Sequence, residues 1–500
     1  MRTIRILLAV AVLAIGARAH VGSPDIYFDG KAGPYQLFVS VRPPLVIPGV
    51  AELEIRSETP GVHEIRAIPL PLSGPGAQFA PVPDKLHASP QDSQFFTGSL
   101  WMMATGSWEV RLSVNGDQGK GVLAIPVPSV ARSTQKMQRG LGALLSLLGI
   151  FLIGGVVAMA GAAVREARLP PGAIPNPDAK RRGRIAMSIA FLLVIGAVWG
   201  GSFWWSNEAG TYEQRVYKPL QMSAVLDPSG IMTLNLTDPG WLKPPPGRIA
   251  LFTRKMDDIV PDHDHLMHLY AIRQPGLDAV YHLHPNLIDT GVFRVTLPAM
   301  HPGQYKLYAD IVHATGFPET LIATADIPAL PGRPLAGDDA AGFAKPWNQS
   351  SPTGTEFVLP DGYRMEWLRP ADLRSKEPIL FRFRLSDPAG HAPHDMALYM
   401  GMLGHAAFVK TDGSVFAHVH PSGSVSMAAL MMAERQSGAH AKSMPGMSMS
   451  ATDSAMHSSA ALPDEVRFPY GFPTTGRYRM VVQMKHGGTI ETGIFDASVK

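Results

Sequence analysis

The sequence His282-Leu283-His284-Pro285 returns later in the chain as His418-Val419-His420-Pro421. Each copy follows a lone histidine and precedes a glycine-aromatic strand that ends in another histidine. The interval from that glycine to that histidine is the same in both copies, which is typical of duplication. The C-terminal half is therefore predicted to hold two related modules, each with a histidine site. The landmarks are His268, Gly303, Tyr305 and His313 in the first copy, and His405, Gly476, Tyr478 and His486 in the second.

Length and composition narrow the classes of protein. A chain of 500 residues is too long for one hydrophobic core and indicates two to four domains. A formal net charge of +3 gives no indication of a nucleic-acid partner. The chain has no cysteine, which excludes disulfides, thiolate metal sites and cysteine nucleophiles. Any metal ion must therefore be held by His, Met, Asp or Glu.

The N-terminus is typical of a secretory signal peptide over residues 1–19, since arginines precede an apolar run and small residues end it. An uncleaved anchor is the alternative, but the run is too short to span a bilayer. Cleavage would leave His20 first, where the α-amine and imidazole can chelate one copper ion together as a histidine brace. His63, His87 or an acidic residue would have to complete that site. The alternative is that cleavage simply falls beside a histidine.

Two long apolar segments, residues 141–164 and 185–205, predict a pair of transmembrane helices within residues 138–207. Basic residues dominate the loop of residues 165–184, so the positive-inside rule places that loop in the cytoplasm. Both flanking regions are then expected on the outer side of a bacterial inner membrane, in the periplasm. Two buried helices of a soluble domain are the alternative, and the basic loop argues against it.

The remaining sequence predicts a mainly β protein with three antiparallel β-sandwiches. Residues 20–130, 212–331 and 355–500 each contain short alternating apolar segments separated by turn residues. The last two regions are expected to be cupredoxin-like or immunoglobulin-like. Residues 332–354 have a linker composition. Residues 427–459 are rich in Met, His, Ser and Ala, and are predicted to form a loop that interrupts the second module.

Histidines two apart on a strand point to the same face, so the imidazoles of each HxH pair can converge on one ion. Four imidazoles suit Cu(II) or Zn(II). The alternative is that each HxHP ends a strand with exposed histidines. The first module adds a further i, i+2 pair, His263 and His265. The predicted ligands are His268, His282, His284 and His313 in the first module, and His405, His418, His420 and His486 in the second.

The Met-rich segment favours copper, because thioether sulfur binds Cu(I) and has little use for zinc. A spacer of small residues and methionine is the alternative. The first site is predicted to favour Cu(II) or Zn(II) and the second to suit Cu(I). The residues concerned are Met444, Met447, Met449, Met456, His440 and His457.

Two stretches in each histidine module carry a resemblance to a known group of proteins. YMGMLGHAAFVKTDGSVFAHVHPSG with TTGRYRMVVQMKHGGTIETGIFDASV, and PDHDHLMHLYAIRQPGLDAVYHLHP with GQYKLYADIVHATGFPETL, resemble bacterial exported proteins with an HxHP signature. That resemblance implies a periplasmic β-sandwich domain linked with heavy-metal handling. SLWMMATGSWEVRLSVNGDQGKGVLAIPV in the N-terminal region looks like the closing strands of YtkA-like domains.

The order of segments is similar to that of the B-type subunit of particulate methane monooxygenase. Both have a signal peptide, a mature N-terminal histidine, a β-domain, two helices and a second β-domain. The N-terminal region here has no HxH pair, and the last module has no counterpart in that subunit, which argues against an oxygenase.

Three functional hypotheses follow. The first is a membrane-anchored copper-binding protein for sensing, buffering or delivery to a copper-handling partner. The second is a copper oxidoreductase, or a subunit of one, with a brace at His20. The third is a structural scaffold. No serine-histidine-aspartate order, paired carboxylates or phosphate-binding loop supports hydrolysis or phosphoryl transfer.

Overall fold

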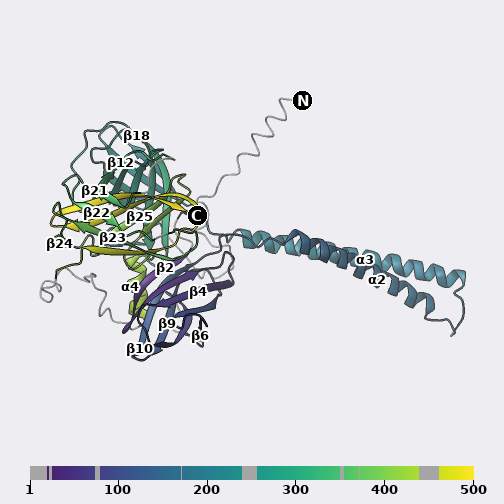
Figure 1. Ribbon diagram of the computed structural model, residues 1–500. Coiled ribbons are helices and arrows are strands. Elements are labelled where there is room, and N and C mark those ends of the chain that lie inside the picture. Colours follow the sequence, from purple (N-terminus) through teal and green to yellow (C-terminus); the bar gives the residue numbers. More distant parts are fainter. Residues whose placement is uncertain are drawn as a thin grey trace. The chain divides into compact units, whose positions relative to one another are not determined.

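The computed structural model describes residues 20–21, 25–73, 79–170, 172–238, 256–348, 354–370, 372–437 and 461–500. The chain divides into two compact units, of which the smaller is Ala131–Tyr217 and the larger is the remainder. The smaller unit is a helical hairpin and the larger is built almost entirely from β-sheets. The prediction of a mainly β protein with two membrane-length helices is thus confirmed (Figure 1).

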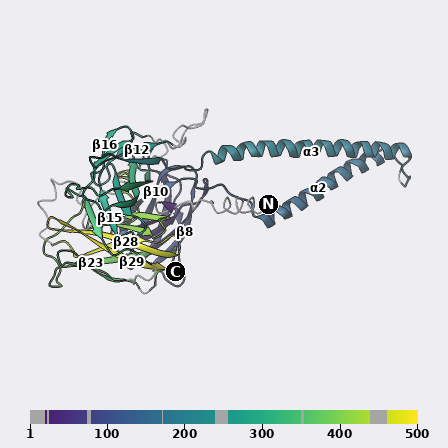
Figure 2. The ribbon, with the colours of Figure 1, turned by 90° about the horizontal axis from the view of Figure 1, so that it is seen from above.

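The hairpin consists of α2 (Arg139–Glu166) and α3 (Pro177–Glu213), which extend beyond the two predicted apolar segments. Both are long and apolar enough to cross a membrane. Their backbones come together where two glycines face each other, because a Cβ added at Gly183 would lie 3.0 Å from the carbonyl oxygen of Gly161. Small residues at such a crossing allow close packing in lipid. Figure 2 shows the C-terminal end of α2 meeting the N-terminal end of α3.

The N-terminal region forms two antiparallel sheets, as its alternating apolar pattern predicts. Along β3, for example, Leu37, Val39 and Val41 are fully buried. The first sheet has the order β2-β3-β4-β8-β7, with bounds Ile26–Ala32, Tyr35–Arg42, Gly49–Ser57, Phe95–Met102 and His87–Ala88. The second has the order β10-β9-β5-β6, with bounds Gly119–Ser129, Gly106–Gly116, Val62–Pro71 and Asp84–Lys85.

The first histidine module also has two sheets, which enclose one apolar core. The first outer sheet is β11-β12-β17-β16, with bounds Gln221–Leu226, Ile231–Thr237, Val292–Thr296 and Asn286–Asp289. The first inner sheet is β13-β18-β14-β15-β20, with β19 also on β18. Its bounds are Ile259–Val260, Gly303–His313, His268–Arg273, Ala279–Leu283, Ala340–Phe343 and Pro318–Ile327.

The second histidine module repeats this plan around its own core. The second outer sheet is β21-β22-β23-β27, with bounds Glu356–Val358, Arg364–Trp367, Ile379–Ser386 and Glu465–Tyr470. The second inner sheet is β1-β26-β25-β28-β24, with β29 also on β28. Its bounds are His20–Val21, Val415–Val419, His405–Lys410, Gly476–His486, Met396–Ala397 and Thr489–Val499.

The two inner sheets pack face to face, so their strands are buried on both sides. A separate apolar cluster joins them, in which Phe416 stacks on Tyr308 with ring centroids 4.2 Å apart. Along β26 the residues alternate: Val415, Ala417 and Val419 enter the module's own core, whereas Phe416 faces the other module. A strand places every second side chain on the same face. The histidines of each HxH pair therefore share the face that meets the other module.

In three places the structure differs from the predicted segments: in the linker, in the Met-rich loop and at the start of the N-terminal domain. The predicted linker of residues 332–354 contains β20, whose Ala340 pairs with His282 in the first inner sheet. The predicted Met-rich loop begins with a helix, α4 (Met427–Ser437), which packs against the N-terminal sheets. His20–Val21 does not join the N-terminal sheets but pairs in parallel with β26. The first and third segments are placed by strand pairing with a neighbouring sheet. For α4 the sequence did carry a signal, because MAALMMAERQS consists mainly of strong helix formers.

Candidate metal centre

Eight histidines gather where the two inner sheets meet, and they are called here the histidine cluster. Ring centroids within it lie as close as 3.9 Å for His265 and His284 and 4.6 Å for His418 and His420. Rings also approach across the two modules, at 5.4 Å for His268 and His418. The members are His263, His265, His268, His282, His284, His405, His418 and His420.

Two sets of nitrogens in the cluster could each hold one ion. His268, His282 and His284 form the first ligand group, and His263, His405 and His420 form the second. Within each group the ring nitrogens lie within 4.8 Å of one another. The first group comes from one module, whereas the second combines one histidine of the first module with two of the second.

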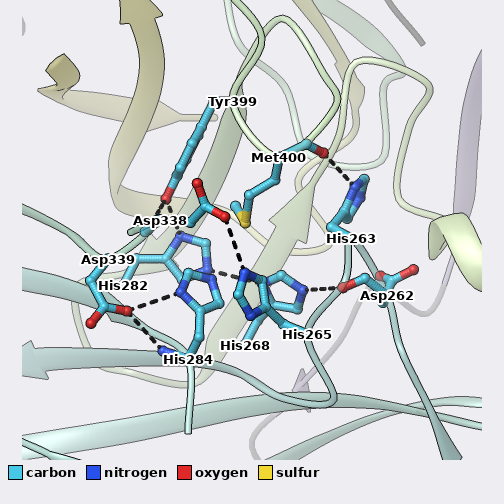
Figure 3. Close-up of polar contacts among 10 residues, drawn as sticks. All are labelled: Asp262, His263, His265, His268, His282, His284, Asp338, Asp339, Tyr399 and Met400. Atoms are coloured by element: carbon cyan, nitrogen blue, oxygen red, sulfur yellow. Dashed lines mark hydrogen bonds and ion pairs between the residues drawn. The ribbon is translucent and has the colours of Figure 1, made fainter. Parts of the chain in front are cut away.

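Oxygen acceptors fix the ring tautomers in the cluster. A carbonyl oxygen can only accept, so Nδ1 of His263 donates to the carbonyl of Met400 (2.9 Å) and Nδ1 of His420 to that of Val425 (3.0 Å). Nδ1 of His284 faces Asp339 at 3.0 Å (Figure 3). The opposite nitrogens are left with free lone pairs. Accordingly, the Nε2 atoms of His263, His284, His418 and His420 are buried without a hydrogen-bond partner among the described residues. Neither ring nitrogen of His405 has such a partner there.

One pair of nitrogens already has the spacing of metal ligands. Nε2 of His268 donates to the carbonyl of Asp262 (2.9 Å), and Nδ1 of His282 donates to Oε1 of Gln483 (2.9 Å). In the neutral tautomers that these two acceptors set, the remaining nitrogens, Nδ1 of His268 and Nε2 of His282, carry lone pairs and lie 3.2 Å apart. Two ligands at 2.0–2.1 Å from one tetrahedral ion stand about 3.3 Å apart. A cation would therefore relieve the repulsion of these lone pairs.

The imidazoles of both ligand groups, and that of His418, have lowered pKa values. Burial, reinforced by neighbouring histidines, lowers the pKa of His263 to about 3. Burial likewise lowers the pKa of His268 to about 3. It also places the pKa of His282, His284, His405 and His418 well below the ordinary range, and it lowers that of His420. Neutral imidazole is the form that binds a metal.

Each module also supplies an oxygen atom that orients a histidine of the other. Oε1 of Gln483 accepts from His282, and Oδ2 of Asp310 lies 3.2 Å from Nδ1 of His418. Asp310 and Gln483 occupy matching places, opposite His268 and His405 in the ladders of β18 and β28. The reciprocal contacts are those of a two-fold arrangement within one chain.

Replacing Gln483 by Leu is expected to weaken copper binding by about 10- to 100-fold, because His282 Nδ1 loses the nearer of its two partners and keeps only the Tyr399 hydroxyl at 3.3 Å. A competition titration of the full-length protein measures this affinity. Thr492→Val is the matched control, since it removes the contact on the opposite side of the same amide. Equal affinities for Gln483→Leu and the parent protein would contradict this role.

The structure separates two predicted ligands from the cluster. Nδ1 of His313 lies 2.6 Å from Asp258 and its Nε2 lies 3.0 Å from Glu319, so both ring nitrogens are occupied. These hydrogen bonds outweigh burial and raise the pKa of His313. His486 stands at the matching end of β28, in a third group with Asp361 and Glu491. The shared position of the two histidines at a strand end thus reflects the repeat and not a shared ligand set.

The other predicted ligands lie elsewhere. His20 is placed only by its backbone, opposite Val415 on β26. Its suggested partners belong to other sheets: His63 on β5 faces Asp117 at 2.6 Å, and His87 is exposed on β7. The side chain of His20 lies outside the part of the chain that the structure describes, so the histidine brace stays a prediction. Met444, Met447, Met449 and Met456, with His440 and His457, lie outside the described residues.

Met400 is a residue beside the cluster that the sequence reasoning missed. It lies in a short turn closed by the bridge of Tyr399 with Met402, which matches the bridge of Asp262 with His265 in the first module. Met400 and His263 both have a left-handed φ, 50° and 52°, and both precede the module's lone histidine by the same interval. Aligning DHDHLMH with YMGMLGH was the signal that could have found it. Figure 3 shows the Met400 side chain pointing toward the first module's histidines.

Comparisons with known proteins identify no function. A family model described as a domain of unknown function (DUF8832) matches residues 357–500. No curated protein matches the chain. Similar solved structures include a tetra-tandem repeat in the extending region of a large adhesion protein, 7% identical over 91% of this chain and 71% of that one, with a TM-score of 0.15. Another is a putative membrane anchored protein from Corynebacterium diphtheriae, 9% identical over 95% and 94%, with a TM-score of 0.15.

Proposed function

We propose that this chain is a copper-binding protein of the bacterial inner membrane, with three β-sandwich domains in the periplasm and residues 165–184 in the cytoplasm. Its role is copper sensing, buffering or delivery to a copper-handling partner. The observation that carries the proposal is the convergence of buried, unpartnered Nε2 atoms in the histidine cluster. Buried polar groups are almost always hydrogen-bonded, so a set of orphaned lone pairs aimed at one another calls for a cation.

The charge of the cluster favours copper as Cu(I). The cost of burying an ion grows with the square of its charge, so a neutral imidazole set accepts a monovalent ion more readily than a divalent one. Met400 adds a thioether, which is a soft donor suited to Cu(I). Zinc is the competing ion, because imidazole also suits Zn(II).

The test is an anaerobic Cu(I) titration, with elemental analysis, of full-length protein purified in detergent without a histidine tag. The parent protein is expected to bind Cu(I), and the double variant His268→Ala with His405→Ala to lose most of that binding, because each ligand group loses one nitrogen. His391→Ala with His394→Ala, two exposed histidines, is the matched control. Equal binding by the parent and the His268/His405 variant would refute the proposal.

The adjacency of the two ligand groups favours a second candidate function, a copper-dependent oxidoreductase. Rings of different groups come within 6.1 Å for His263 and His268 and 6.4 Å for His282 and His405. Two copper ions that close could share the reduction of O₂ when an electron donor is supplied. Oxygen consumption by the copper-loaded protein in the presence of ascorbate tests it, with the His268/His405 double variant as the control.

A further inference from the structure

The matched ladders of the two inner sheets set up a residue-by-residue correspondence. β13 pairs with β18 so that Ile259 lies opposite His313, and β24 pairs with β28 so that Met396 lies opposite His486. Counting onward from these two positions, the turn of residues 262–265 corresponds to the turn of residues 399–402. His263 and Met400 are therefore equivalent residues, as are His268 and His405.

This correspondence shows that the second ligand group is completed by the opposite module. His405 and His420 belong to the second module, but the third nitrogen is that of His263, on the first module's turn. His263 has ring centroids 4.9 Å from His405 and 4.8 Å from His420, whereas its distance to His268 in its own module is 6.1 Å. The turn thus reaches across the interface.

The same rule places Met400 in the first ligand group. His268 and His284 are the equivalents of His405 and His420. Since His263 of the first module reaches His405 and His420, its equivalent in the second module is expected to reach His268 and His284. That equivalent is Met400. Figure 3 shows its thioether directed toward these rings, and the hydrogen bond from His263 Nδ1 to the Met400 carbonyl joins the two turns at 2.9 Å.

We infer that the histidine cluster is a two-ion centre, in which each copper ion is held by the HxHP strand of one module and by the turn of the other. This inference rests on the proposed function and extends it. The first-module ion takes His268, His282 and His284 with the Met400 thioether, and the second-module ion takes His405 and His420 with His263. The soft sulfur ligand assigns the stronger preference for Cu(I) to the first-module ion, the reverse of the assignment expected from the Met-rich segment.

Two variants of the full chain test the exchange of ligands. His263→Ala is expected to weaken the binding of the second-module Cu(I) ion by at least about tenfold, because only the second group contains His263. The first-module ion is expected to lose less affinity, since it loses only the hydrogen bond that His263 donates to the Met400 carbonyl. Met400→Leu is expected to weaken the first-module ion about tenfold for Cu(I) while leaving Zn(II) affinity unchanged, because zinc does not use a thioether. Met103→Leu, an exposed methionine of the N-terminal region, is the matched control.

The readout is a two-step competition titration against a chromophoric Cu(I) chelator, repeated with Zn(II). Two ions per chain with these selective losses support the inference. The inference that the modules exchange ligands is wrong if the protein binds one ion per chain, or if His263→Ala leaves both titration steps unchanged. Either result leaves the copper-binding proposal intact. If the parent protein binds no Cu(I), the proposed function itself is contradicted. Failure of the ligand exchange and failure of the proposed function therefore give different results. Far-ultraviolet circular dichroism of each variant shows whether it is folded.

Discussion

Copper loading is expected to raise the free energy of unfolding of the full-length protein by about 4 kcal/mol for each ion present at a free concentration 1,000 times its Kd. The physical reason is that the ion binds a preformed set of lone pairs that exists only in the folded state. In the tautomers set by Asp262 and Gln483, the lone pairs of His268 Nδ1 and His282 Nε2 already face each other at 3.2 Å. Chemical denaturation followed by near-ultraviolet circular dichroism, with and without copper, measures the change.

The His268/His405 double variant is the control for that experiment, since it removes one nitrogen from each ligand group. Its stability is expected to be insensitive to copper, and a chelator is expected to return the parent protein to its copper-free value. A copper-induced gain of the same size in the variant would show that the ion binds elsewhere.

Replacing Phe416 by Ala is expected to lower the free energy of unfolding by about 3–5 kcal/mol and to weaken copper binding as well. Phe416 is fully buried between the inner sheets and stacks on Tyr308 with an interplanar angle of 7°. It lies on the same face of β26 as His418, two residues away. Loss of the ring leaves a cavity beside the histidines, so both measurements should change together.

Phe468→Ala separates the two effects. Phe468 is equally buried, but it lies on β27 in the second outer sheet, where it packs against Phe383. A comparable loss of stability without a change in the copper affinity of the folded protein is expected. If Phe416→Ala also leaves copper affinity unchanged, the apolar contact between the inner sheets does not hold the ligand groups in place.

Local patterns predicted the strands and the shared face of each HxH pair, because both depend only on the two-residue period of a strand. The sequence pattern could not show which other sheet would pack against the face that carries the histidines. His282 and His418 point away from their own cores and into the opposite module, so the ligand sets depend on packing between segments more than a hundred residues apart. The same limit explains Asp339, which lies in the predicted linker yet accepts from His284.

Spacing alone did not predict that His313 and His486 lie apart from the histidine cluster. Their matched intervals arise from the duplication, and the structure places carboxylates around both of them. Met400 was missed for the opposite reason, because the residue at the matching position of the repeat changes from histidine to methionine. A repeat therefore identifies equivalent positions reliably, but equivalent positions need not keep equivalent chemistry.

The reciprocal contacts of Gln483 with His282 and of Asp310 with His418 have a consequence for how such a centre can change. In a symmetric homodimer every substitution appears twice, so both halves of a shared site must accept it. Here the two halves belong to one polypeptide, and each can be altered alone. The differences between His263 and Met400, and between Asp310 and Gln483, are changes that a fused pair can carry and a symmetric homodimer cannot. Under the two-ion proposal, they would give two neighbouring ions different binding strengths.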